Sequence, residues 1–242
     1  MTGYNRDQFG PAWADVDHNG CDTRNDVLRD DMNNVQPARG CIVTSGVLAP
    51  DPYSGKVIDF TRGATSSERV QIDHVVALGD AWQSGAQSLT LTTRTLFGND
   101  PYNLLAVDGS LNEQKGDANA ASWLPPNGSY RCQYVARQVG VKVKYGLSVT
   151  APERDSIARV LATCPGQPLP LDPGTVVVPA PVAPPNTTPA PPAPASTPAS
   201  SVPVAVHPGA FCTPGGATGV TAAGTAMVCK PASDGRLRWA AA

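Results

Sequence analysis

Two stretches decide the fold: residues 70–82, VQIDHVVALGDAW, and residues 99–123, NDPYNLLAVDGSLNEQKGDANAASW. VQIDHVVAL is β-rich and apolar on both sides of Asp73 and His74, which predicts a buried strand. In the second stretch NLLAV is typical of a short strand and Asp108-Gly109 of a turn. Ser110 and Glu113 have capping-box spacing, so we expect a helix from Leu111. The predicted order is strand, turn, strand, helix.

The segments around this core predict further strands and helices. CIVTSGVLA and KVIDFTR are β-rich and are separated by PDPYSG, a turn cluster that favours an N-terminal β-hairpin. Flanking helices are expected from about Arg6 into residues 15–17, through Val27 and Leu28, in pieces within residues 79–97, through Arg137, and after a second capping box at Thr150 and Glu153. The fold class is therefore α+β.

Proline divides the chain into three parts. Most of the 25 prolines fall between residues 165 and 208, where the only charged residue is Asp172. Such a segment buries too little side chain to offset its ordering entropy, so we expect residues 165–210 to be an extended, disordered linker. Residues 1–164 are then one globular domain, and residues 211–242 a small module that needs a disulfide staple.

The net charge of −2 excludes a generally basic, nucleic-acid-binding surface. One local patch is a candidate, because residues 118–152 contain no acidic residue but four cations. Two alternatives stay open for it, contact with a polyanion or a solvated helix face. The four cations are Arg131, Arg137, Lys142 and Lys144.

Six cysteines without a C-x-x-C pair indicate disulfides instead of a zinc site. Pairing within each part leaves three connectivities, and we favour Cys21–Cys41, Cys132–Cys164 and Cys212–Cys229 because each closes a short loop. Disulfides imply a secreted, extracellular protein whose signal peptide is absent from this sequence. No run of 18 apolar residues exists, so no transmembrane segment is expected.

The N-terminal region contains an EF-hand-like pattern. Asp15, Asp17, Asn19 and Asp26 occupy positions 1, 3, 5 and 12 of a calcium loop, with Gly20 at position 6. Aspartate at position 12 is short for bidentate binding, and a turn with Asx caps is the alternative.

His74 is the best candidate for a general base. Of the three histidines, only His74 lies on a predicted strand beside a carboxylate. At the end of a strand, Asp73 can face a cation while His74 faces the nucleophile. Asn112, in the first turn of the following helix, supplies a second oxygen ligand, which suits Mg²⁺ because this ion keeps several waters. Asn103 can hydrogen-bond the loop that carries His74. Taken singly, an Asp-His pair on a strand is more often a hydrogen-bonded core pair.

The ordered set Asp73-His74, Asn103-Leu104 and Asn112-x-x-Lys115-Gly116 resembles the ββα-metal motif of HNH endonucleases. The wider string is similar to the GmrSD C-terminal type, found as secreted proteins in actinobacteria. The resemblance implies that Asp73 and Asn112 hold one Mg²⁺ or Mn²⁺ ion. It also implies that His74 activates water, that Asn103 orients the His74 loop, and that Lys115 lies near the scissile phosphate.

These expectations give a metal-dependent endonuclease that hydrolyses DNA or RNA with little sequence specificity, with Arg131 and Arg137 on the nucleic-acid backbone. The alternative is a secreted, calcium-dependent binding protein that keeps a nuclease-like core. The C-terminal tail resembles modules that follow proline-rich tethers, so a cell-surface role is one interpretation and a stapled mini-domain the other. A toxin with an immunity partner is one of several biological roles that fit the sequence.

Overall fold

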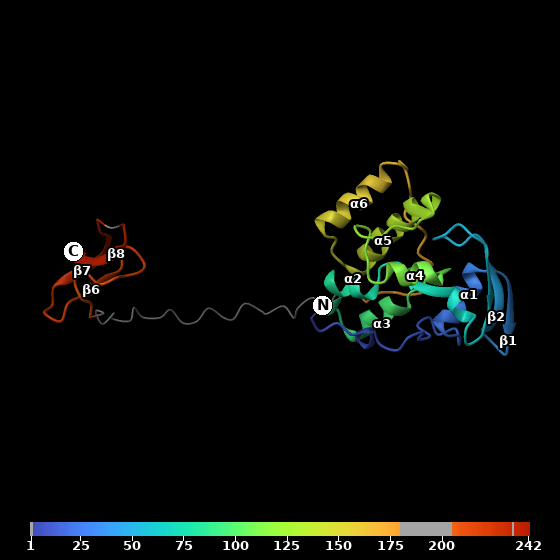
Figure 1. Ribbon diagram of the computed structural model, residues 1–242. Coiled ribbons are helices and arrows are strands. Elements are labelled where there is room, and N and C mark those ends of the chain that lie inside the picture. The colour runs from blue at the N-terminus through green and yellow to red at the C-terminus, as the bar shows by residue number, and fades with distance from the viewer. Residues whose placement is uncertain (1, 180–204, 234) are drawn as a thin grey trace. The chain divides into compact units, whose positions relative to one another are not determined.

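The computed structural model describes residues 2–179, 205–233 and 235–242 (Figure 1). The chain divides into two units, Met1–Pro181 and Val182–Ala242. Helices and strands are mixed along the first unit, which confirms the predicted α+β class.

The N-terminal region begins with one short 3-10 helix, η1 (Arg6–Phe9), and its next helix is α1 (Thr23–Asp31). The helix expected from Arg6 into residues 15–17 is therefore wrong beyond its first turn. Gly10 ends η1 with a φ of 73°, a conformation that glycine adopts without steric cost, and a proline follows. Asp22 caps α1 by accepting a hydrogen bond from the Asn25 backbone N–H at 2.8 Å.

The predicted hairpin is confirmed as β2 (Ile42–Leu48) and β3 (Ile58–Thr61), which pair antiparallel. A third strand, β1 (Asn33–Ala38), pairs with β2 at the edge of the same sheet. The sequence did not predict β1, because its segment NNVQPA is polar and contains a proline. Side chains of β2 and β3 pack against α1 in a core that includes Val27, Leu28, Val43 and Phe60.

A second, two-stranded sheet carries the sequence motif. Its strands are β4 (Val70–His74), which follows η2 (Ser67–Arg69), and β5 (Leu104–Asp108). They pair antiparallel, with His74 opposite Leu104. Helix α4 (Gly109–Lys115) follows β5 directly and packs against β4. The predicted order of two strands followed by a helix is therefore confirmed. The predicted turn is not found, because helices separate β4 from β5 and α4 begins at Gly109, two residues before Leu111.

Helices surround this sheet. Between β4 and β5 lie α2 (Leu78–Gln83), η3 (Ala86–Ser88) and α3 (Leu91–Asn99). After α4 come η4 (Gly128–Tyr130), α5 (Arg131–Tyr145) and α6 (Ala151–Leu161). The Thr150–Glu153 capping box is present at the start of α6, as predicted. Helices α5 and α6 lie side by side (Figure 1).

The first unit continues past Cys164, where the sequence predicted a linker. The Tyr102 hydroxyl donates a hydrogen bond to the Pro170 carbonyl at 3.1 Å. Lys144 forms an ion pair with Asp172 at 2.9 Å, and Val176 is 3% exposed. The described residues 165–179 are therefore part of the globular body. Residues 180–204, which contain most prolines of the expected linker, lie outside the described residues.

The second unit is a small antiparallel sheet of β6 (Thr218–Val220), β7 (Ala226–Pro231) and β8 (Leu237–Ala241). Ala205 already pairs with Val220, so this unit begins before the predicted residue 211. The disulfides are Cys21–Cys41, Cys132–Cys164 and Cys212–Cys229, which confirms all three predicted pairings. Among the described residues, none of the helices is long and apolar enough to cross a membrane.

Candidate active site

The predicted residues on the strand pair β4–β5 and on helix α4 lie around one cavity of about 300 Å³. Asp73 and His74 come from the end of β4, and Asn112 comes from α4. The cavity is lined by side chains that include Arg6, Gln71, Asp73, His74, Asn112, Glu113 and Asp117. The three residues that the sequence assigned to the base and the metal therefore share one cavity.

The hydrogen bond of His74 fixes the tautomer of its ring. Nε2 lies 2.9 Å from the Gly98 carbonyl oxygen, and a carbonyl only accepts, so Nε2 carries the proton. Nδ1 then holds the lone pair, and no described residue hydrogen-bonds it. Burial lowers the pKa of His74 to about 4, and the charges of Arg6 and Lys115 act in the same direction. The ring is therefore neutral at pH 7, as a general base must be.

Asp73 is held between a phenol and an ammonium. Tyr53 donates to Oδ2 at 2.5 Å, and Lys115 Nζ lies 2.9 Å from Oδ1. Burial raises the pKa of Asp73, and the charge of Lys115 and the hydrogen bond from Tyr53 oppose that rise. Each carboxylate oxygen has a second lone pair, so Asp73 can still serve as the cation ligand that the sequence predicts.

The sequence predicted that Lys115 lies near the scissile phosphate and binds nucleic acid, but in the structure its ammonium is buried and engaged by the protein. Lys115 is 2% exposed, and besides Asp73 its ammonium donates to the backbone carbonyl of His74 at 2.8 Å. A lysine at the end of a short helix has the reach to fold back onto the neighbouring strand, and here it offsets the buried charge of Asp73. Lys115 therefore supports the end of β4 from inside the protein.

Asn103 makes the contact that the sequence predicted. Its Oδ1 accepts a hydrogen bond from the Val76 N–H at 2.9 Å, and its Nδ2 donates to the Val76 carbonyl at 3.3 Å. Both backbone groups of Val76 are thereby held. Asn103 is fully buried, so it fixes the loop that follows His74 without touching the cavity.

Asn112 lines the cavity, and its amide oxygen, Oδ1, is the atom that could bind a cation. Its Nδ2 donates to Gln71 Oε1 at 2.8 Å, and Gln71 Nε2 donates to Glu113 at 2.9 Å. No hydrogen bond to Asn112 Oδ1 is found among the described residues, which leaves this oxygen available. Gln71 was not predicted, although its position two residues before Asp73 places both side chains on one face of β4.

The oxygen donors fit a hard cation. Asn112 Oδ1 is available, Asp73 lines the same cavity, and Glu113 and Asp117 add negative charge there. Oxygen ligands with room for water suit Mg²⁺ or Mn²⁺ more than a softer metal. Among the described residues, no group of three or more histidine, cysteine, aspartate or glutamate side chains is placed to hold a metal ion, so a cation here would need the Asn112 amide and water as further ligands.

The two arginines of the predicted basic patch on α5 donate hydrogen bonds to backbone carbonyls of the protein. The Arg131 guanidinium donates to the Pro125 carbonyl at 2.8 Å, and Arg137 donates to the carbonyls of Pro101, Tyr102 and Leu104. Both arginines are partly buried, because α5 packs its cationic side against loops that present carbonyl groups. These contacts occupy most donors of Arg137 and one nitrogen of Arg131, and the assignment of both residues to nucleic-acid binding stays a prediction.

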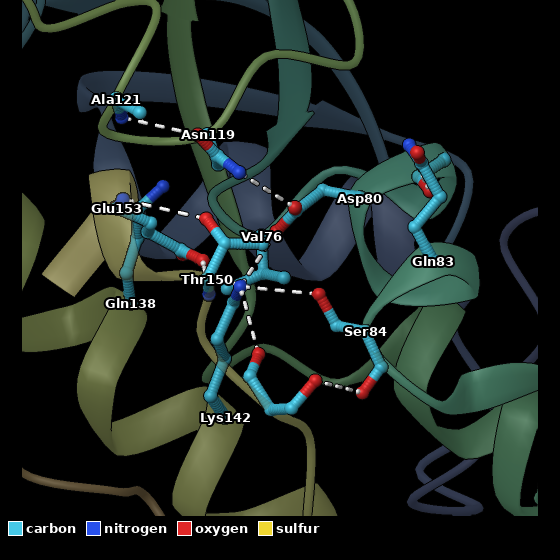
Figure 2. Close-up of polar contacts among 12 residues, drawn as sticks. Val76, Asp80, Gln83, Ser84, Asn119, Ala121, Gln138, Lys142, Thr150 and Glu153 are labelled. Carbon is cyan, nitrogen blue, oxygen red and sulfur yellow. Dashed lines mark hydrogen bonds and ion pairs between the residues drawn. The ribbon is translucent and has the colours of Figure 1, made fainter. Parts of the chain in front are cut away.

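The two lysines of that patch form buried or partly buried ion pairs. Lys142 Nζ lies 2.9 Å from Asp80 and 2.6 Å from Glu153, and it also contacts Ser84 (Figure 2). Lys144 pairs with Asp100 at 2.8 Å. The absence of acids from residues 118–152 was misleading, since the partners come from other parts of the chain.

The EF-hand-like loop has the alternative arrangement, a turn with Asx caps. Asp15 and Asp17 each accept a hydrogen bond from the Asn19 backbone N–H, and Asn19 Nδ2 donates to Asp17 and Asp26. Arg29 pairs with Asp26 at 2.8 Å. The loop is closed by its own side chains, and calcium binding there stays a prediction.

Comparison with known proteins gives the family. The family described as GmrSD restriction endonucleases, C-terminal domain, matches residues 22–160. This chain belongs to that family. An uncharacterized secreted protein of Arthroderma benhamiae is 43% identical over 166 residues, which cover 68% of this chain and 77% of the relative. The actinobacterial source that the sequence suggested stays a prediction.

Membership of the GmrSD C-terminal domain family indicates a nuclease-type function at the level of the family. The match includes β4, β5 and α4 together with Asp73, His74, Asn103 and Asn112. It does not include η1 or residues 2–13, which contribute Arg6 to the cavity. The sequence analysis also missed Tyr53 and the Gly98 carbonyl, because neither contact follows from spacing along the chain.

Proposed function

We propose that this protein is a metal-dependent endonuclease of the HNH type that hydrolyses phosphodiester bonds of DNA or RNA with little sequence specificity. The observation that carries the proposal is the fixed tautomer of His74. Its Nε2 is engaged by Gly98, and its unpaired Nδ1 belongs to a ring that lines the same cavity as Asp73 and Asn112. A neutral imidazole in this position is suited to take a proton from water.

The residues of this chain divide the work as follows. His74 Nδ1 accepts the proton of the attacking water, and the Gly98 carbonyl holds the ring and stabilises the imidazolium that forms. Asn103 keeps the following loop in place through Val76. Asp73 and Asn112 would hold a divalent cation, whose chemistry when bound is to stabilise charge developing on the phosphate and the leaving oxygen.

Secretion is part of the proposal. Three disulfides link all six cysteines, and disulfides persist in oxidising compartments. The relative from Arthroderma benhamiae is named a secreted protein. An exported enzyme without sequence preference would act on extracellular nucleic acid.

The test is cleavage of supercoiled plasmid, linear DNA and RNA with magnesium, manganese, calcium or a chelator. We expect His74→Ala to lower the rate by about 100- to 10,000-fold, the usual share of general-base catalysis. His18→Asn is the matched control, since His18 is exposed and has a φ of 58°, which asparagine tolerates. Plasmid digestion by folded His74→Ala at the wild-type rate would remove the proposal. Calcium-dependent binding without cleavage would favour the binding-protein alternative.

A further inference from the structure

The N-terminal segment, residues 2–13, packs against helices α2 and α3 beside the candidate active site. The Trp82 indole donates to the Thr2 carbonyl at 3.2 Å, and the Tyr4 and Phe9 rings each lie 6.3 Å from the Trp82 ring. On the other side, Arg94 Nε donates to the Gln8 carbonyl at 2.6 Å. The backbone is therefore fastened on both sides of Arg6, although this segment precedes the residues that match the family.

Arg6 lies where two cavities meet. It lines the main cavity and also a smaller one of about 90 Å³, and the residues common to both are Arg6, His74 and Leu78. The smaller cavity also touches Gly98, whose carbonyl orients His74. A ligand that contacts His74 from either cavity therefore lies in a space that Arg6 also lines.

The Arg6 guanidinium is available for contact with a ligand. Its side chain is exposed, and neither an ion pair nor a hydrogen bond of its guanidinium is found among the described residues. Of the described residues that line the main cavity, Arg6 is the only lysine or arginine, whereas Asp73, Glu113 and Asp117 are acidic. The other cations near the site are neutralised, Lys115 by Asp73 and Lys142 by Asp80 and Glu153.

A phosphodiester that enters this cavity meets three carboxylates, so binding requires a compensating cation from the protein as well as from a metal. A guanidinium is suited to this task, because its planar fork donates two parallel hydrogen bonds to phosphate oxygens. We propose that Arg6 binds a non-bridging oxygen of the phosphodiester at the His74 cavity. This inference rests on the proposed nuclease function, and it makes Arg6 a substrate-binding residue outside the matched family region.

The experiment measures binding apart from cleavage. In a full-length His74→Ala background with magnesium, a labelled single-stranded oligonucleotide is titrated at several salt concentrations. We expect Arg6→Ala to weaken binding about tenfold and to reduce the slope of log K against log salt by about 0.7, the loss of one phosphate contact on a single strand. Arg6→Lys should keep the salt slope and recover part of the affinity.

Arg69→Ala is the matched control. Arg69 is also an exposed arginine of a short 3-10 helix, η2, and it lines a different cavity beside Lys56 and Asp108. Its removal should leave affinity and salt slope unchanged. If wild type cleaves nucleic acid but Arg6→Ala binds with unchanged affinity and slope, the Arg6 inference falls alone. If wild type neither binds nor cleaves nucleic acid, the proposed function and the inference fall together.

Discussion

Two lysines in the described part of the chain have buried ammonium groups, and the surroundings of these groups differ. Lys115 and Lys142 are both 2% exposed. Lys115 pairs with one carboxylate, Asp73, which lines the cavity of His74. Lys142 pairs with two, Asp80 on α2 and Glu153 on α6, and none of these three residues lines that cavity (Figure 2). The same chemical group therefore supports a candidate site in one place and joins three helices in the other.

The comparison shows that the cost of removing a buried cation depends on how many buried carboxylates it neutralises. Asp73 has Tyr53 as a second partner, so it keeps one hydrogen bond if Lys115 is lost. Asp80 likewise keeps a hydrogen bond from Asn119 at 3.1 Å, and Glu153 keeps one from the Thr150 backbone N–H at 3.3 Å. Losing Lys142 nevertheless leaves two carboxylate charges without their cation, whereas losing Lys115 leaves one. Two substitutions can separate these roles.

The largest expected effect is that Lys115→Met and Lys142→Met rank in opposite order for loss of stability and for loss of cleavage. Removing either ammonium leaves buried carboxylate charge, which costs about 3–5 kcal/mol of unfolding free energy. We expect Lys142→Met to be the more destabilising, since it strands two carboxylates. Lys115→Met should lower plasmid cleavage more, because it releases both Asp73 and the His74 carbonyl. Denaturant unfolding measures the loss of stability. Plasmid cleavage, assayed under conditions in which both variants are folded, measures the loss of activity.

Equal loss of cleavage in the two variants, with both folded, would contradict the distinction. Val143→Met is a suitable control, because it introduces a methionine on the same helix, α5, at a position that is 72% exposed and removes no charge. It should change neither unfolding free energy nor cleavage.

The next effect is on the titration of His74. Its pKa is lowered to about 4, and Lys115 contributes to that lowering whereas Lys142 does not. Catalysis that needs the neutral ring should therefore persist from pH 7 to about pH 5 and fall about tenfold per pH unit below about 4. Removing Lys115 should raise the pKa of His74, and removing Lys142 should leave it unchanged. The chain has three histidines, so NMR of the ring protons can follow each one.

The same shift makes stability depend on pH. Between about pH 6.5 and 4 the unfolded chain binds a proton at His74 that the folded protein does not. The free energy of unfolding therefore decreases as the pH falls through this window. A His74 resonance that titrates near 6.5 in the folded protein would contradict both expectations.

The smallest effect is expected from Tyr53→Phe. This change removes the hydrogen bond to Asp73 but keeps the ring, which packs edge-on against Trp123 and Tyr134. We expect a loss of about 1–3 kcal/mol, the usual cost of leaving a buried acceptor with one partner fewer, and only a several-fold decrease in cleavage. Tyr130→Phe is the control, since the Tyr130 ring packs on Tyr53 but its hydroxyl does not contact Asp73. Cleavage lost as completely as in Lys115→Met would show that Tyr53 does more than hold Asp73.

The strands and helices of the motif could be predicted because their signals are local. β4 and β5 are apolar runs, and Asn103 sits where its amide reaches the loop after β4. Helix starts were less predictable, since capping groups compete. Thr150 forms its capping box with Glu153, whereas at α4 the Asp108 carboxylate accepts from the Ser110 and Leu111 N–H groups and takes the cap position from Ser110.

The electrostatic part of the site could not be predicted in the same way. Whether a cation is free depends on carboxylates and carbonyls brought by folding from distant segments. Lys142 has a partner 62 positions before it in Asp80, and Arg137 is engaged by carbonyls of the loop before β5. Arg6 was overlooked for the opposite reason, since a single arginine near the N-terminus has no pattern, and only the packing of Tyr4 and Phe9 brings it to His74.

The distribution of the disulfides leaves the polypeptide backbone as the only covalent link between the two units. Two bridges close within Met1–Pro181, one closes within Val182–Ala242, and no bridge connects the two. A single peptide-bond cleavage between Cys164 and Cys212 would therefore yield two fragments with no disulfide between them, so their separation would not require a reductant. The fragment with His74 would retain both of its own cross-links.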